Sequence, residues 1–393
     1  MFLSIALYFI CIFLIWWAYC GYIFVFYLFS LFADTRKTSR TIREPHLSVS
    51  ILIPCYNEEP LVKKKVDNIK ALDYPRDKLR VYFLDGVSSD KTLERLTEEC
   101  RGHDYLHVVE TNVTGKINQL NTILTKIDTD IIVNTDMDAL MKSDSLLKIV
   151  REFQDNQDVS LVGARVSPLD PGGIEGQYWE TQNWLRIIES KVVSSSIVVA
   201  PCYAFRSALF WRFPDDCVAD DIFISFFVNF AGKKTVYLED ALVYEGRTSQ
   251  TIEQFITHKF RKANAYLTEL LRFFYLLPKA DGKRKTIYLT KVLQVAVIPW
   301  ILVFFFLASI SFLLSGMGTV QVVLFAIIFL GISLATAHIL VRKGIRSAHQ
   351  KNIRTYSSIL IFLIVNLILI MAGITYPFLI QTSRYPKIDH AKD

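Results

Sequence analysis

Two aspartates, Asp136 and Asp138, are the residues whose type and spacing point most directly to chemistry. They follow the β-branched apolar run 131–133, which is typical of a buried strand. On an extended chain, side chains two residues apart point to the same side. At the end of a parallel strand such carboxylates face the crevice in which α/β sheets bind ligands, and hard oxygen donors suit Mg²⁺ or Mn²⁺. A strand-to-loop junction with solvated acids is the competing explanation.

Three other segments carry polar residues directly after predicted strands or before a predicted helix. Pro54 to Glu59 follows the strand 49–53, and its tyrosine, asparagine and glutamates could hold a base and a ribose. Asp85 follows the strand 80–84 and could accept hydrogen bonds from the same nucleoside. Lys116 precedes a helix, from where a lysine can reach a diphosphate. Taken singly, each segment could equally be an ordinary loop, a helix cap or a solvated lysine.

The elements that must position these segments alternate along the chain. The predicted strands are 49–53, 80–84, 107–109 and 130–133, and the predicted helices are 59–71, with its lysines on the outer face, 89–100 and 117–127. This alternation predicts an α/β fold, a mostly parallel sheet with helices on both faces. Since parallel strands end at the same edge of a sheet, we expect the four polar segments to converge there.

Apolar segments flank this domain. The first, Phe2 to Phe32, has no charged residue and is longer than the roughly 20 residues that span a bilayer. Basic residues follow it and also separate the last two apolar spans, which places the central domain in the cytoplasm. The predicted parts are a transmembrane helix at 1–33, a cytoplasmic α/β domain at 46–250, amphipathic interfacial helices at 251–285, and three transmembrane helices within 290–383, at 292–314, 320–341 and 359–380.

Composition agrees with this division. Hydrophobic residues make up 52% of the 393 residues, above the usual range for a soluble domain. The six cysteines are scattered without a C-x-x-C pair, which argues against a disulfide framework and a zinc site. The net charge of +6 comes without a basic-aromatic motif, so we expect no nucleic-acid partner. The sequence therefore predicts an integral protein of the cell membrane.

The ordered motifs resemble glycosyltransferase family 2, which has the GT-A fold. They are P-x-Y-N-E-E at Pro54–Glu59, a D-x-x-S-x-D pattern within Tyr74–Asp90, G-K-x-x-x-L-N at Gly115–Asn121, and D-x-D-A at Asp136–Ala139. The flanking helices are similar to those of the membrane-integrated branch, which includes hyaluronan, chitin, cellulose and poly-N-acetylglucosamine synthases and lipid glycosyltransferases. The resemblance implies a nucleotide-sugar donor, a UDP-sugar first of all, and Mg²⁺ or Mn²⁺ bound by Asp138 with Asp136. The donor-binding residues that it implies are Pro54, Tyr56, Glu58, Asp85, Lys116 and Asp136.

The family also has an acidic pair before a helix, and Asp220 and Asp221 fit that position. By this resemblance Asp221 is the general base, beside Asp220. The alternative is that both acids only cap the helix that begins near Ile222. Asp215 and Asp216 are neighbouring acids that could take the same role.

A later motif departs from the family pattern. Where related membrane enzymes have Q-x-x-R-W, this chain has His258-Lys259-Phe260-Arg261-Lys262. Arg261 is retained, and with His258 or Lys259 it could hold the leaving diphosphate. Lys262 replaces the tryptophan, so a stacking platform for an acceptor sugar is missing. A basic amphipathic helix lying on anionic lipid is the competing explanation for this run.

These observations lead to one expected function and two alternatives. We expect a metal-dependent hexosyltransferase that inverts the anomeric carbon and transfers a sugar to a membrane lipid or a lipid-linked saccharide. The first alternative is a processive polysaccharide synthase that extrudes its polymer through the membrane helices. The second is a non-catalytic membrane scaffold that only binds a nucleotide-sugar.

Overall fold

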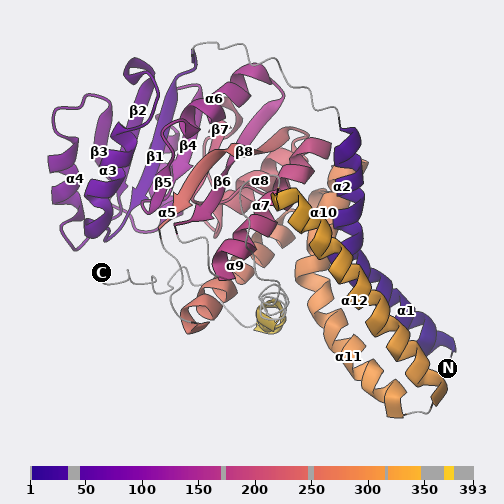
Figure 1. The fold of residues 1–393 in the computed structure, drawn as a ribbon. Coiled ribbons are helices and arrows are strands. Elements are labelled where there is room, and N and C mark those ends of the chain that lie inside the picture. Colours follow the sequence, from indigo (N-terminus) through magenta and orange to yellow (C-terminus); the bar gives the residue numbers. More distant parts are fainter. Residues whose placement is uncertain are drawn as a thin grey trace.

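An α/β domain and a group of long helices form the parts of the chain that the structure describes (Figure 1). The structure is a computed structural model, and it describes residues 2–33, 45–169, 174–246, 252–314, 317–346 and 367–375. In Figure 1 the bundle of α1, α11 and α12 projects away from the sheet, and α9 runs across the direction of that bundle.

One sheet of eight strands has the order β3-β2-β1-β4-β7-β6-β8-β5. Its strands are β1 (Val49–Cys55), β2 (Leu79–Asp85), β3 (Leu106–Glu110), β4 (Ile131–Thr135), β5 (Ala139–Met141), β6 (Val159–Pro168), β7 (Cys202–Arg206) and β8 (Lys234–Glu245). β1 pairs in parallel with β2 and β4, and β2 with β3, as the alternation predicted. Beyond β4 the sheet is mixed, because β7 is antiparallel to both β4 and β6. The α/β prediction is confirmed, with a sheet that is mixed and mostly parallel.

Helices cover both faces of the sheet. The helices α3 (Val62–Lys70), α4 (Thr92–Cys100) and α6 (Ser145–Asp155) pack on one apolar core, and α5 (Lys116–Leu124) and α8 (Asp220–Phe230) on the other. Alternate residues of β1 divide between the two cores: Ile51 and Ile53 face the first and Leu52 the second. This is the period of two that places a strand between two apolar layers.

The prediction that the lysines of the first helix lie on its outer face is wrong for Lys65. This side chain is 0% exposed. Val62, Val66 and Ile69 form the buried stripe of α3, and position 65 falls on the same stripe because residues three and four apart share a helix face. The ammonium group therefore needs polar partners inside the domain.

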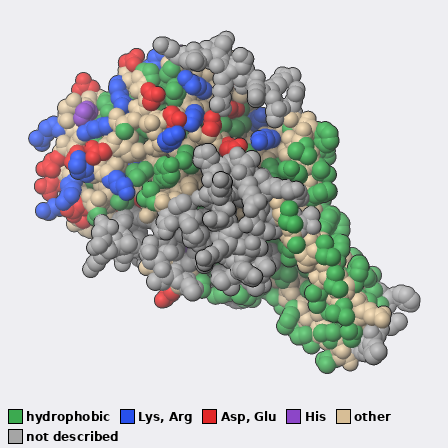
Figure 2. All heavy atoms as spheres, viewed as in Figure 1, with side chains coloured by type: hydrophobic (Ala, Val, Ile, Leu, Met, Phe, Trp, Pro, Cys, Tyr) green, Lys and Arg blue, Asp and Glu red, His purple; other side chains and the backbone are tan. Residues whose placement is uncertain are grey.

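Two of the long helices are apolar enough to cross a membrane, at residues 4–32 and 282–314. They consist of α1 (Phe2–Trp16) and α2 (Tyr22–Phe32), and of α10 (Gly282–Val292) and α11 (Ile298–Leu314), each pair joined by a π-helical turn. A third, α12 (Met317–Arg346), contains the predicted span 320–341. Most of the predicted span 359–380 lies outside the described residues. The part that the structure describes, 367–375, is helical. Figure 2 shows apolar side chains over the projecting bundle and charged ones over the α/β domain.

The helix predicted to begin at Val292 begins earlier, at Gly282. Asp281 caps it, because its carboxylate accepts hydrogen bonds from the backbone N–H of Lys283 (3.1 Å) and of Arg284 (3.0 Å). The helix thus enters the apolar span from within the segment that was predicted to be interfacial.

A buried ion pair joins α7 (Ile174–Val192) to these long helices. The carboxylate of Glu189 accepts hydrogen bonds from the Tyr22 hydroxyl (2.7 Å) and the Ser196 backbone N–H (2.8 Å), and its Oε1 lies 3.1 Å from Lys291 Nζ. Because the partners come from α2 and α10, this contact fixes the α/β domain against both apolar helices.

Candidate active site

Asp136 and Asp138 lie in the turn between β4 and β5, where the backbone N–H of Ala139 donates to the carbonyl of Asp136 (3.2 Å). The expectation of an extended chain at this point is therefore wrong. The buried ammonium group of Lys65 stabilises this turn, because it donates hydrogen bonds to three acceptors around it. Lys65 Nζ donates to Thr135 Oγ1 (3.1 Å), to the Asp136 carbonyl (2.8 Å) and to the Ala139 carbonyl (2.5 Å). Burial lowers the pKa of Lys65 to about 8, and the two nearby aspartates oppose that shift.

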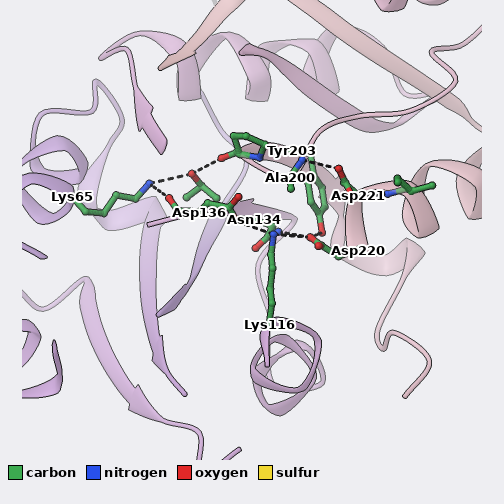
Figure 3. A network of polar contacts seen from close by, with 11 residues as sticks. Lys65, Lys116, Asn134, Asp136, Ala200, Tyr203, Asp220 and Asp221 are labelled. Atoms are coloured by element: carbon green, nitrogen blue, oxygen red, sulfur yellow. Dashed lines mark hydrogen bonds and ion pairs between the residues drawn. The ribbon is translucent and has the colours of Figure 1, made fainter. Parts of the chain in front are cut away.

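Lys116 joins this turn to the acidic pair at the start of α8. Its Nζ lies 2.8 Å from Asp136 Oδ1 and 3.1 Å from Asp220 Oδ2 (Figure 3). Burial alone would lower the pKa of Lys116, but the carboxylates of Asp136 and Asp220 raise it above its usual value, so the lysine is charged. Two motifs that are far apart in the sequence thus share one ammonium group. The predicted convergence of Lys116 with Asp136 at the end of β4 is observed.

The two acids of the pair have different surroundings. Asp220 Oδ2 also accepts hydrogen bonds from Asn134 Nδ2 (2.8 Å) and the Tyr203 hydroxyl (2.8 Å), so this buried carboxylate ties β4 and β7 to α8. Asp221 Oδ2 accepts a hydrogen bond from the backbone N–H of Ala200 (2.9 Å) in the loop before β7. Asp220 therefore holds the site together, which leaves Asp221 as the better base.

Burial and the neighbouring Asp220 raise the pKa of Asp221 to about 6, although Lys116 and Lys262 act in the opposite direction. A carboxyl with this pKa is largely ionised at neutral pH and can still accept a proton readily. The capping explanation is wrong, because α8 begins at Asp220, both acids lie in its first turn, and the N-cap residue is Ala219. Asp221 Oδ1 accepts a hydrogen bond from the backbone N–H of the next residue, Ile222 (3.0 Å). Each oxygen atom of Asp221 therefore accepts one backbone hydrogen bond and keeps a second lone pair that can accept a proton.

The other acids near this pair belong to surface ion pairs. Asp215 lies 2.6 Å from Arg212, and its side chain is 79% exposed. Asp216 lies 3.0 Å from Arg272, and its side chain is 72% exposed. Neither contact includes a residue of the site, so both acids are poor candidates for the base.

The segments after β1 and β2 stand side by side, as predicted. The parallel register pairs Cys55 with Asp85, which brings the Tyr56 loop next to the end of β2. Asp85 is 3% exposed, and its Oδ2 accepts a hydrogen bond from the Ser88 backbone N–H (3.1 Å). Its buried Oδ1 has no hydrogen-bond partner within the described ranges. An unpaired buried carboxylate oxygen is costly, so this atom is available for a donor group of a ligand.

The two positions after Asp85, Gly86 and Val87, differ in the side chain and backbone conformation that they allow. A Cβ atom at Gly86 would lie 1.7 Å from Gln119 Nε2, so any larger residue would displace Gln119 from its hydrogen bond to the Cys55 carbonyl (3.1 Å). Val87 has a positive φ of 65°, which is rare and strained for a β-branched residue. Of the other predicted contacts, Pro54 lies within β1, Tyr56 is exposed and Glu58 is buried.

The basic run of α9 (Ile252–Arg272) reaches the acidic pair through Lys262, whose charge acts on Asp221. Burial, followed by the charges of Lys262, Arg261 and Lys259, lowers the pKa of His258 well below its usual value, so the imidazole is neutral at pH 7. Lys262 Nζ also lies 5.8 Å from the ring centroid of Trp179 in α7. No sequence motif associates Trp179 with the site.

The residues present fit a divalent metal ion held jointly with a substrate. Asp136 and Asp138 supply hard carboxylate donors, and Asp138 lines a cavity of about 60 Å³ together with Lys64, Lys65 and Gly246. In the described part of the chain, no group of three or more His, Cys, Asp or Glu side chains is placed to bind a metal ion. Mg²⁺ usually takes one or two carboxylates and completes its shell with substrate phosphates and water, so such a site does not require three protein ligands.

Comparison with known proteins identifies the family of the central α/β domain. Residues 50–218 match the model of glycosyl transferase family 2. A β-monoglucosyldiacylglycerol synthase of Nostoc sp. is 35% identical over 127 residues, which are 32% of this chain and 27% of that relative, so the match spans about a quarter of its length. A poly-β-1,6-N-acetyl-D-glucosamine synthase of Staphylococcus epidermidis is 24% identical over 303 residues, 73% of this chain and 71% of that protein.

The fold has a solved counterpart as well. A mannosyltransferase of Pyrobaculum calidifontis, solved in complex with GDP-Man and Mn²⁺, has a TM-score of 0.64 at 23% sequence identity, and the likeness covers 90% of this chain and 96% of that one. At this identity the likeness concerns the fold alone. Taken with the motifs and the acids that converge on Lys116, these matches lead to one conclusion: residues 50–218 form a domain of glycosyltransferase family 2, and the fold is of the GT-A type.

Proposed function

We propose that this protein is a membrane-embedded inverting glycosyltransferase that transfers a hexosyl group from a nucleotide-sugar to a membrane lipid or a lipid-linked saccharide. The observation that carries the proposal is the pair of contacts of Lys116, which bring Asp136 within the same site as the acidic pair. An inverting transfer needs groups for the departing diphosphate on one side of the anomeric carbon and a base on the other.

The donor side is formed by the β1, β2 and β4 ends. The unpaired Oδ1 of Asp85, with the Tyr56 loop beside it, would bind the nucleoside. The mannosyltransferase with the same fold was solved with GDP-Man and Mn²⁺, which supports a nucleotide-sugar and a divalent ion without fixing the nucleotide. A UDP-sugar remains our prediction. Asp138 and Asp136 would hold Mg²⁺ or Mn²⁺, which supplies Lewis-acid stabilisation of the diphosphate.

The chain's own side chains then perform the transfer. Asp221 accepts the proton of the acceptor hydroxyl as its oxygen bonds to the anomeric carbon and the bond from that carbon to the diphosphate breaks. Arg261 and Lys259 would offset the charge that grows on the leaving group, and the neutral His258 can donate a hydrogen bond to it. Lys116 provides a further cation on the diphosphate side.

The acceptor would lie at the membrane because the domain is fixed to two apolar helices. Glu189 connects the α/β domain to α2 and α10 in the interior of the structure, not through a flexible linker. This supports a domain that works at a membrane surface, with α9 lying in the interface. The basic residues beside the apolar spans predict that this surface is the cytoplasmic one of the cell membrane. The glucosyldiacylglycerol synthase among the relatives supports a lipid acceptor.

A processive polysaccharide synthase is the second candidate, because the poly-N-acetylglucosamine synthase matches 71% of its own length. Lys262 speaks against it, since it stands where the stacking tryptophan of such enzymes is expected. Incubating the purified protein with a panel of labelled nucleotide-sugars and native lipids separates the candidates. Label in low-mass, lipid-soluble product supports our proposal, and label in high-mass product supports the synthase.

The scaffold alternative is tested in the same experiment with one variant. We expect the wild type to release nucleoside diphosphate from its donor. In Asp221→Asn we expect the turnover number to fall by a factor of about 10²–10⁴ while donor binding persists. Binding of donor without any turnover by the wild type would establish the scaffold and refute our proposal.

A further inference from the structure

Lys116 stands between two acids that differ in their access to solvent (Figure 3). Its Nζ lies 2.8 Å from Asp136 Oδ1 and 3.1 Å from Asp220 Oδ2. The side chains of Lys116 and Asp136 are 27% and 30% exposed, whereas that of Asp220 is 7% exposed. Ligands from solution can therefore reach the contact between Lys116 and Asp136, while the contact with Asp220 belongs to the interior.

Asp220 does not depend on Lys116 alone. Its Oδ2 also accepts hydrogen bonds from Asn134 Nδ2 and the Tyr203 hydroxyl, each at 2.8 Å. If the ammonium group turned away, this buried carboxylate would keep two donors, which limits the cost of its burial. The side chain of Lys116 is thus free to exchange one partner for another.

For the carboxylate of Asp136, the pairing with Lys116 is decisive. Lys65 contacts the backbone carbonyl of Asp136, so within the described ranges Lys116 is the cation paired with its side chain. A neighbouring positive charge lowers the proton affinity of a carboxylate by about tenfold to a thousandfold. The same charge repels Mg²⁺ or Mn²⁺, which carry two charges. The lower end of this range applies here, because a partly exposed lysine can turn toward solvent.

A diphosphate would remove this repulsion. Lys116 is the first residue of α5, and the N-terminal end of a helix attracts phosphate groups. A diphosphate carries more negative charge than one carboxylate, so it competes with Asp136 for the ammonium group. Once Lys116 has turned to the diphosphate, the carboxylate of Asp136 is available to a metal ion.

We propose that Lys116 is a positioning residue that makes metal binding depend on the donor. Without a diphosphate ligand, its ammonium group stays on Asp136 and weakens the binding of Mg²⁺ or Mn²⁺. A nucleoside diphosphate draws the ammonium group away, so the metal ion and the donor strengthen each other's binding. This inference rests on the proposed function, because it takes Asp136 as part of the metal site.

The test measures Mn²⁺ binding by the full-length protein in detergent, with and without nucleoside diphosphate. Electron paramagnetic resonance detects the Mn²⁺ that remains free in solution, so the dissociation constant is obtained without turnover. In the absence of nucleotide, we expect Lys116→Met to bind Mn²⁺ about tenfold more tightly than the wild type. With UDP or GDP the wild type should gain affinity and Lys116→Met should gain less, after correction for Mn²⁺ bound by the nucleotide itself.

Three variants complete the comparison. Lys116→Gln also removes the charge but still offers a hydrogen bond to Asp220, so it repeats the test if the methionine variant does not fold. Lys116→Arg keeps the charge and should bind Mn²⁺ like the wild type. Lys148→Met is the matched control, because Lys148 is 23% exposed and lies 2.8 Å from Asp144 of another acidic contact, in α6. It should leave Mn²⁺ binding unchanged.

The outcomes separate this inference from the proposed function. Nucleotide-free Mn²⁺ binding that is no tighter in Lys116→Met and Lys116→Gln than in the wild type would overturn the inference. An equal tightening in Lys148→Met would also overturn it, because the cause would then be the overall charge of the protein. Failure of the wild type to bind Mn²⁺ even with UDP or GDP would refute the proposed metal-dependent transfer, and the inference would fall with it.

Discussion

The acid limb of the pH–rate profile gives the sharpest test of the proposed base. Burial and Asp220 raise the pKa of Asp221 to about 6, and Lys116 and Lys262 are the charged groups that oppose this shift. A general base must be ionised, so kcat/KM should rise with pH through about pH 6 and level off above it. About one unit below the pKa only about a tenth of the carboxyl is ionised, which predicts a roughly tenfold loss at about pH 5.

The size of this loss in kcat/KM distinguishes Asp221 from an exposed aspartate. An exposed aspartate has a pKa of about 3.9 and would give almost no loss at about pH 5. The assay measures kcat/KM for transfer from about pH 4 to about pH 8, because this ratio reports the groups of the free enzyme. Metal and donor are kept saturating in a parallel series, so that protonation of Asp136 or Asp138 is recognised as a loss of metal binding.

Two variants show which residue produces the limb. Lys262→Gln removes a positive charge that lowers the pKa of Asp221, so the limb should move to higher pH. Asp221→Asn should leave a weak residual activity without a limb near pH 6. A limb that persists unchanged in Asp221→Asn, or that lies near pH 4 in the wild type, would refute the assignment of this residue as the base.

Three further predictions concern the turn after β4, the ion pair between α7 and α10, and the loop after β2. Lys65→Met should lower the free energy of unfolding by about 3 kcal/mol and weaken Mn²⁺ binding, because three acceptors of the turn lose their donor. Chemical denaturation and Mn²⁺ titration measure the two effects. The control is Lys63→Met at an exposed position of the same helix, and an effect of Lys65→Met no larger than that of the control would contradict the prediction. Lys291→Met should destabilise the protein by about 3–5 kcal/mol, since it leaves Glu189 buried without its cation; an unchanged melting temperature in detergent would count against this contact. Val87→Gly should stabilise the protein by up to about 1 kcal/mol, because glycine adopts a φ of 65° without strain; a lower melting temperature would show that the valine makes contacts that outweigh the strain.

The first half of the fold follows from the sequence because its signals are local. The strands at Val49–Cys55, Leu79–Asp85 and Ile131–Thr135 are apolar runs between amphipathic helices, and such alternation gives parallel neighbours. The second half depends on pairings that no local pattern encodes. Cys202–Arg206 is antiparallel to β4, and the long connection through α6, β6 and α7 would allow either direction.

The predicted site divides in the same way. The positions of Asp85, Asp136 and Asp221 at one sheet edge follow from strand ends and family motifs, and the structure brings them to that edge. The different surroundings of Asp220 and Asp221 could not be predicted, because they depend on side chains from β4, β7 and α5 that meet only in the folded domain. Trp179 carried no signal either, since its neighbour Lys262 is distant in sequence.

Lys65 is different, because the sequence did contain its signal. Val62, Lys65, Val66 and Ile69 have the spacing of one buried helix face, and a lysine on such a face must find acceptors in the core. The helix follows β1, so its core-facing side lies against the neighbouring strands of the parallel sheet, one of which leads into the D-x-D turn. An ammonium group in that position has only the carbonyl and hydroxyl groups at the strand end as partners. A lysine within the apolar stripe of a helix therefore predicts that its ammonium group binds backbone carbonyl groups in the core. Here those carbonyl groups belong to the turn that carries Asp136 and Asp138.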